Sequence, residues 1–174
     1  MLCGSAGSSK KFDGLRQAVT VISHVRRTMT HDQIIPFLVD KLKKYPDIKF
    51  DQKGNSELTI YPRNDKGFGL TVMTNERENT LYFGHAYHWH FDNSETKQTE
   101  MLDQIVFGLT GIARIKVSTK NKKAYKWTLE LQDQNGNWSD NGTTGLLNLN
   151  FWTQPEFHYL QNDLLPIGII RADN

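Results

Sequence analysis

The segment 81–92 constrains the fold of this chain more than any other, because two kinds of side chain alternate along it without a break. Leucine, aromatic residues and one histidine occupy the odd positions: Leu81, Phe83, His85, Tyr87, Trp89 and Phe91. The even positions carry Tyr82, Gly84, Ala86, His88, His90 and Asp92. Successive side chains of a strand point to opposite faces, so this pattern predicts one strand whose aromatic face meets a core. His88, His90 and Asp92 are then expected on the opposite, exposed face.

Helical and alternating patterns divide the rest of the chain into short elements. Apolar residues at helical spacing predict helices at 13–28, at 30–45 and immediately before Gly111. Alternation predicts strands at 57–63, 67–74, 113–117, 125–131 and 147–151. The segment 157–165 fits a short helix or a strand equally well. The Asn-Gly pairs at 135–136 and 141–142 are interpreted as turns.

Short connections between the first three strands favour an antiparallel meander, and one apolar face per strand is typical of an antiparallel sheet covered on one side. We therefore expect an α+β fold of two layers, with a single twisted, mainly antiparallel sheet of about five to seven strands. Three helices are expected to pack on the aromatic face of that sheet. Residues 1–11 are interpreted as a flexible N-terminal tail and 12–174 as one α+β domain.

Composition limits the class of protein. A chain of 174 residues that is 37% hydrophobic suits one folded domain. No apolar stretch approaches the roughly 18 residues of a membrane span and no signal-peptide core is seen, which favours a cytoplasmic location without membrane contact. Cys3 is the only cysteine, so an intramolecular disulfide is impossible. A net charge of +2 does not by itself indicate nucleic-acid binding.

His88 and His90 are the first candidates for a metal site. Two positions apart on one face of a strand, they are about 7 Å apart. Their imidazoles could bind one divalent metal ion if a third ligand came from Asp92, Glu130 or His158. Exposed histidines without a defined third ligand are more often ordinary surface residues, so we assign no metal ligand.

The same histidines also suit a metal-free reaction. Imidazole titrates near neutral pH, so His88 and His90 are candidates for general acid and base. Glu130, Lys126 or Arg114 would then stabilise charge in a phosphodiester or acyl-transfer reaction. A sequence supplies neither the cavity nor the geometry of such a site, so we assign no catalytic residue.

Positive charge gathers in the predicted hairpin 113–131. Thirteen residues contain six cations and no acid: Arg114, Lys116, Lys120, Lys122, Lys123 and Lys126. Such a cluster attracts phosphate or an acidic protein, although lysines also protect sheet edges from aggregation. Tyr87, Trp89 and Trp127 are assigned to the buried face, so no stacking platform for bases is expected beside the cations. Nucleic acid is therefore the less favoured ligand.

The sequence thus favours a protein that binds rather than one that catalyses. We expect a non-enzymatic, immunity- or inhibitor-like protein without a cofactor, which docks another protein or a charged ligand through its open polar sheet face or its basic hairpin. The expected binding residues are His88, His90, Arg114, Lys116, Lys126 and Glu130. The alternative is a small hydrolase, either assisted by a divalent metal at His88 and His90 or using acid/base chemistry with Glu130, as in a nuclease.

Overall fold

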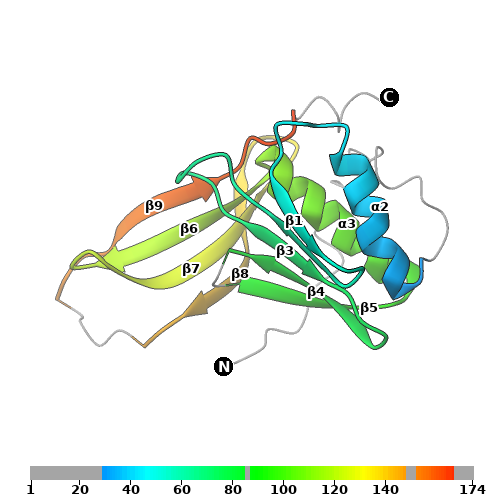
Figure 1. Cartoon of the computed structure of the whole chain (residues 1–174). Coiled ribbons are helices and arrows are strands. Elements are labelled where there is room, and N and C mark those ends of the chain that lie inside the picture. The colour runs from blue at the N-terminus through cyan, green and yellow to red at the C-terminus, as the bar shows by residue number, and fades with distance from the viewer. Residues whose placement is uncertain (1–28, 85–86, 148–151, 167–174) are drawn as a thin grey trace.

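The strands of this protein form two antiparallel sheets. The computed structural model describes residues 29–84, 87–147 and 152–166. These ranges hold two helices and nine strands, in the order α2 (His31–Leu42), β1 (Phe50–Lys53), β2 (Glu57–Ile60), β3 (Leu70–Met73), β4 (Glu78–Phe83), β5 (Tyr87–Asp92), α3 (Glu95–Thr110), β6 (Ala113–Lys120), β7 (Lys123–Gln132), β8 (Trp138–Gly145) and β9 (Glu156–Gln161). The first sheet is the meander β1-β2-β3-β4-β5, and the second has the order β8-β7-β6-β9 (Figure 1).

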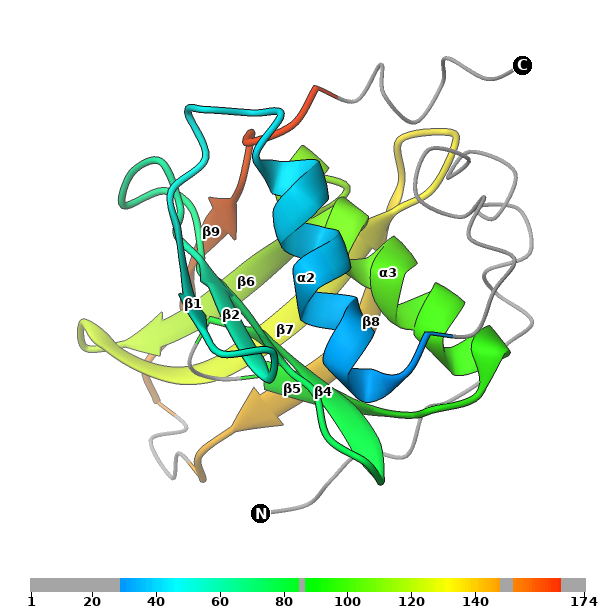
Figure 2. The same cartoon turned by 45° about the vertical axis from the view of Figure 1, so that its right-hand side comes forward.

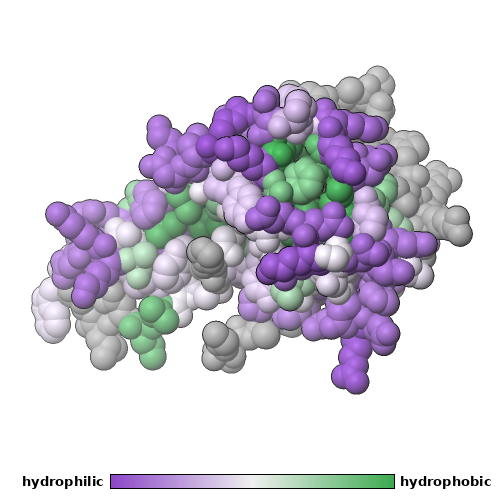
Figure 3. All heavy atoms as spheres, viewed as in Figure 1, coloured by the Kyte–Doolittle hydropathy of each residue, from purple (hydrophilic) through white to green (hydrophobic). Residues whose placement is uncertain are grey.

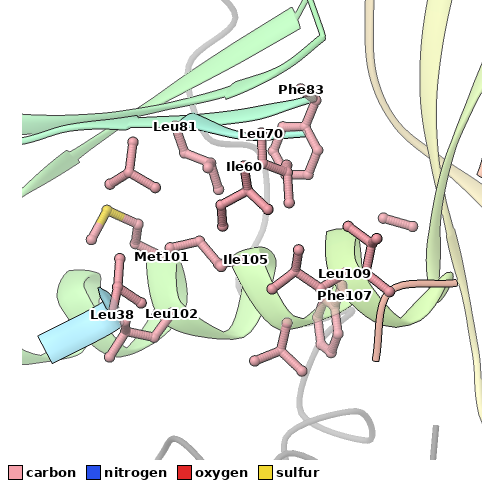
Figure 4. Packing of buried hydrophobic residues seen from close by; sticks show 14 of the residues in the cluster. Leu38, Ile60, Leu70, Leu81, Phe83, Met101, Leu102, Ile105, Phe107 and Leu109 are labelled. Carbon is pink, nitrogen blue, oxygen red and sulfur yellow. The ribbon is translucent and has the colours of Figure 1, made fainter. Parts of the chain in front are cut away.

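The two helices lie on one side of the first sheet. Helix α3 contacts β4 and β5 and also β6 of the second sheet. Helix α2 lies beside α3 (Figure 2). The close view in Figure 4 shows side chains of both helices packed with strand residues, among them Leu38, Met101, Ile105, Leu81 and Phe83. The same buried cluster continues to Ile115 and Leu129, so one core connects both sheets.

Both described helices follow the patterns in the sequence. In α2 the buried side chains are Ile34, Ile35, Leu38, Val39 and Leu42. The Thr30 backbone N–H donates to Gln33 Oε1 at 3.1 Å, as the capping-box spacing predicts. Helix α3 buries the predicted stripe and ends at Gly111. Its N-cap is Ser94, whose hydroxyl accepts from the Lys97 N–H.

The predicted single sheet with three helices is wrong. The described residues contain two sheets and two helices, while the predicted helix at 13–28 and the tail at 1–11 lie outside them. Alternation identifies the two faces of a strand but not its neighbours, so it could not show where one sheet ends. Helix α3 carries the chain from β5, at the edge of the first sheet, to β6, in the interior of the second. The α+β class and the antiparallel pairing are confirmed.

The segment 81–92 is part of a hairpin rather than one strand. Strands β4 and β5 pair antiparallel, with Phe83 opposite Tyr87 and Leu81 opposite Trp89. Directly paired residues of two strands share a face. Three residues connect Phe83 to Tyr87, so the odd-numbered residues of β4 and β5 lie on the same face and the alternation in the sequence looks unbroken. Gly84 has a φ of +61°, which favours glycine and begins the turn. His85, predicted to lie with the aromatic row, falls outside the described residues.

The sequence patterns did not predict β1 or β8, and they did not distinguish β9 from a short helix. Strand β1 lies in a polar segment without clear alternation. Strand β8 includes Asn141 and Gly142, which we interpreted as a turn, and its residues are mostly small or polar. The segment 157–165, for which a helix and a strand were both possible, begins with five residues of β9. The predicted strand at 147–151 is not seen at Leu147, and its other residues lie outside the described ranges.

Gly142 lies where β5 of the first sheet approaches β8 of the second. Its φ is +150°, and a Cβ atom there would lie 1.8 Å from Tyr87 Oη. The Tyr87 hydroxyl also donates to the Asn141 carbonyl at 3.4 Å. The absence of a side chain at Gly142 therefore allows the aromatic ring of one sheet to contact the backbone of the other.

We expect Gly142→Ala to destabilise this junction because the new methyl group must displace the Tyr87 ring. The free energy of unfolding should fall by about 1–3 kcal/mol more than in Gly136→Ala, measured by urea denaturation. Gly136 is a matched control, since its φ is also positive, at +85°, but a Cβ atom there would lie 3.7 Å from its nearest neighbour. Similar losses in the two variants would contradict the close contact.

Asn162, which follows β9, is hydrogen-bonded to the segment before β3 and to α3. This residue is 4% exposed. Its Oδ1 accepts from the Phe68 N–H at 3.1 Å, and its Nδ2 donates to the Phe68 and Gly108 carbonyls, both at 2.9 Å. Next to it, the Gln161 N–H donates to the Lys66 carbonyl at 2.7 Å. We call these four bonds the Asn162 clamp.

Candidate functional site

His88 and His90 lie on the outer face of the first sheet, as the alternation predicts. Both are exposed, and they lie opposite Tyr82 and Thr80 of β4. His90 Nδ1 is 3.1 Å from Glu78 Oε1 and 3.3 Å from Thr80 Oγ1. The His88 ring lies 5.2 Å from the Tyr82 ring and 5.0 Å from the His90 ring, between centroids. Both histidines therefore contact neighbouring side chains on an open surface.

The three candidate third ligands of the histidine pair have other surroundings. Asp92 Oδ1 accepts from the Ser94 N–H at 2.9 Å, and hydrogen bonds from Ser94 lower the pKa of this carboxyl group. Glu130 belongs to the second sheet, and His158 lies on β9 opposite Val117. Within the described ranges, no group of three or more histidine, cysteine or acidic side chains is arranged to hold a metal ion.

Other side chains on this outer face also pair among themselves. Thr59 and Thr71 hydroxyl groups are 3.2 Å apart, and Lys53 lies 2.8 Å from Glu57. Exposed pairs of this kind contribute little to stability, but they use the polar groups that a ligand would need. The first sheet therefore offers a solvated surface rather than an organised site.

The outer face of the second sheet has a different composition. Strand register places alternate side chains of β6 and β7 on it, next to side chains from the two edge strands β8 and β9. We call this surface the cation–aromatic face and define it by seven residues: Arg114, Lys116, Lys126, Glu130, Trp138, Phe157 and Tyr159. Four of them are residues that the sequence analysis named as binding candidates. The structure thus groups Arg114, Lys116, Lys126 and Glu130 on one sheet and His88 and His90 on the other.

Arg114 is held between two aromatic rings. Its Cζ atom lies 3.8 Å from the Trp138 ring centroid and 4.1 Å from the Tyr159 ring centroid. Its Nε atom donates to Glu130 Oε2 at 2.6 Å. A guanidinium stacked on rings and bonded to a carboxylate has little freedom to change its position. This arrangement orients both the cation and the two rings before any ligand arrives.

Glu130 forms ion pairs with two cations of the neighbouring strand, Arg114 and Lys116, so the three side chains together keep one positive charge. Its side chain is 5% exposed, and Lys116 Nζ lies 3.4 Å from its Oε1 atom. A buried carboxylate needs partners for both oxygens, and the contacts with Arg114 and Lys116 supply them. We therefore interpret Glu130 as a positioning residue and not as an accessible acid or base.

Phe157 and Tyr159 bring exposed rings to the side of the cations. They are 52% and 44% exposed, and Lys116 Nζ lies 5.0 Å from the Phe157 ring centroid. Tyr87, Trp89 and Trp127 do pack against the core as predicted, each partly buried. The deduction that no aromatic platform accompanies the cations is nevertheless wrong. The rings come from β8 and β9, whose position beside β6 and β7 depends on sheet order.

The remaining lysines lie at the turn between β6 and β7. Lys122 and Asn121 have φ values of +62° and +49°, and the turn extends from the sheet at the left of Figure 1. In Figure 3 this end of the molecule is hydrophilic, and a hydrophobic area lies next to it over the second sheet. Lys122, Lys123 and Lys126 are exposed. The basic turn therefore extends the positive charge of the cation–aromatic face.

Comparisons with protein-family models, with curated proteins and with solved structures find no match to this chain. None of the helices in the described ranges is long and apolar enough to cross a membrane.

Proposed function

We propose that this protein acts by binding and that its cation–aromatic face holds an anionic ligand. The observation that carries this proposal is Arg114, whose guanidinium is stacked between Trp138 and Tyr159 and bonded to the buried Glu130. A site that is oriented in advance loses less conformational freedom on binding than a set of mobile side chains. Lys126 on the same face and the exposed Lys122 and Lys123 at the adjoining turn attract negative charge.

Charge alone does not distinguish this face from a basic surface without a function, so the test compares two sets of lysines. The parent protein is expected to be retained on immobilised heparin, a polyanion, and to elute with salt. Replacement of Lys122, Lys123 and Lys126 by glutamine should shift elution to lower salt. It should also reduce the slope of log affinity against log salt by up to about three, because each cation that contacts the polyanion releases about one counterion.

The matched control replaces Lys43, Lys44 and Lys49 by glutamine. These lysines are also exposed and lie near the end of α2, far from the β6–β7 turn in Figure 1. The control has the same net charge as the test variant but should elute like the parent. If the parent is not retained, or if both variants shift equally, the cation–aromatic face is not the binding site.

A further inference from the structure

Strand β9 places two exposed rings at the spacing of successive nucleotides. Phe157 and Tyr159 are two residues apart and face the same side, opposite Ser118 and Lys116 of β6. Side chains at this spacing on a strand are about 7 Å apart. That separation is close to the length of one extended nucleotide, so each ring could receive one of two neighbouring bases. Phe157 and Tyr159 are 52% and 44% exposed. Lys116 lies over one face of the Phe157 ring and Arg114 over one face of the Tyr159 ring, so a base would stack on the opposite face of each ring.

Cations lie beside these rings in positions suited to a phosphate backbone. Lys116 Nζ lies near the Phe157 ring, and Lys126 is opposite Ser118 on the next strand. Beyond them, the β6–β7 turn carries Lys122 and Lys123, both exposed. A strand with bases on β9 would therefore have its phosphates directed toward β6, β7 and the basic turn.

An acidic protein is the other class of ligand that this charge would attract. Three acidic residues lie on or beside the face. Glu130 is buried and contacts Arg114 and Lys116. Asp140, opposite Glu130 on β8, and Glu156, the residue before Phe157 on β9, are exposed. An acidic protein would interact with the lysines but has no need of two aromatic rings about 7 Å apart. The two rings therefore favour a ligand whose planar groups lie about that distance apart, as successive bases do.

We infer that the cation–aromatic face binds single-stranded nucleic acid, with two successive bases stacked on Phe157 and Tyr159 and the phosphates held by Lys116, Lys126 and the turn lysines. This inference rests on the proposed function and adds the class of ligand. Stacking on aromatic side chains tolerates any base, so little dependence on sequence is expected.

The test compares probes of equal charge that differ in their bases. Fluorescence anisotropy measures binding of the full chain to a labelled thymidine 12-mer, to an abasic 12-mer and to a 12-base-pair duplex. The thymidine 12-mer should bind at least about tenfold more tightly than the abasic one, since stacking strengthens binding by roughly tenfold for each base. The duplex should bind no more tightly than the abasic strand, because its bases are already stacked on one another.

A double variant, Phe157→Leu with Tyr159→Leu, locates the effect. It should lose most of the preference for thymidine over abasic strand while its affinity for the abasic strand stays within about twofold of the parent. Tyr61→Leu is the matched control, since Tyr61 is 41% exposed but follows β2 in the first sheet. This control should bind all three probes like the parent. Circular dichroism establishes whether each variant is folded. If the double variant is unfolded, the preference of the parent for the thymidine strand over the abasic strand still tests the inference.

Three results would overturn the inference. Equal binding of thymidine and abasic strands, or tighter binding of the duplex, would leave polyanion binding in place but exclude base stacking. Displacement of the thymidine 12-mer by polyglutamate as effectively as by unlabelled thymidine 12-mer would point to an acidic protein partner instead. Failure to bind any probe, together with no retention on heparin, would remove both this inference and the proposed function.

Discussion

Replacement of Phe83 by alanine is expected to lower the free energy of unfolding by about 3–5 kcal/mol, because a large buried ring is removed and a cavity remains. Phe83 is fully buried, and its ring packs against Phe68 and Trp89, with centroids 6.1 Å and 5.9 Å away. Urea denaturation followed by tryptophan fluorescence measures the loss. The dependence on denaturant should stay unchanged, which shows that only stability has changed.

Tyr82→Ala is the control for the Phe83 variant. Tyr82 is the preceding residue of β4, but it points to the outer face and contacts His88. Its removal should cost about 1 kcal/mol or less, the range of a cross-strand pair on an exposed face. Equal losses at the two positions would contradict the assignment of inner and outer faces to this hairpin.

The second large effect is expected at the Asn162 clamp. Asn162→Ala removes the partner of three backbone groups, the Phe68 N–H, the Phe68 carbonyl and the Gly108 carbonyl. A buried polar group left without a partner costs about 1–3 kcal/mol, so the free energy of unfolding should fall by about 3 kcal/mol or more. Chemical denaturation measures the total, and hydrogen exchange should be faster at the Phe68 amide in particular.

Asp163→Ala provides the neighbouring control. The Asp163 side chain is 75% exposed and lies 3.8 Å from Arg63. Loss of such a surface pair should change the free energy of unfolding by about 0.5 kcal/mol or less. A loss of that size at Asn162 as well would show that its hydrogen bonds are replaced by water when the side chain is removed.

Local patterns predicted the elements whose signals lie within one segment. The stripes of α2 and α3, with a stop at Gly111, depend on helical periodicity and on end signals, and both were confirmed. The faces of 81–83 and 87–92 were also confirmed, but the turn was not predicted, since a three-residue connection preserves the alternation. Strand β8 was missed because Asn141-Gly142 favours a turn in isolation, and the packing of Tyr87 against Gly142 is a tertiary effect.

The candidate site shows the same division between local and distant information. Their charge identified Arg114, Lys116 and Lys126 as candidate binding residues in the sequence. The sequence could not associate them with Trp138 or Tyr159, because β8 and β9 meet β6 and β7 only through the order of strands in the second sheet. Glu130 was named as a candidate acid or base, and its burial against two cations from β6 is what changes its interpretation.

The Asn162 clamp also has a consequence for how the chain is made. Its side chain lies 94 residues beyond Phe68, the residue that it holds. Each hairpin of the first sheet joins strands that are adjacent in the chain, so β1 to β5 can pair while the protein is still being synthesised. The clamp can close only after residue 162 has left the ribosome. A chain released between residues 92 and 162 contains the whole first sheet but lacks the Asn162 side chain, so the Phe68 N–H and carbonyl have lost their hydrogen-bond partner.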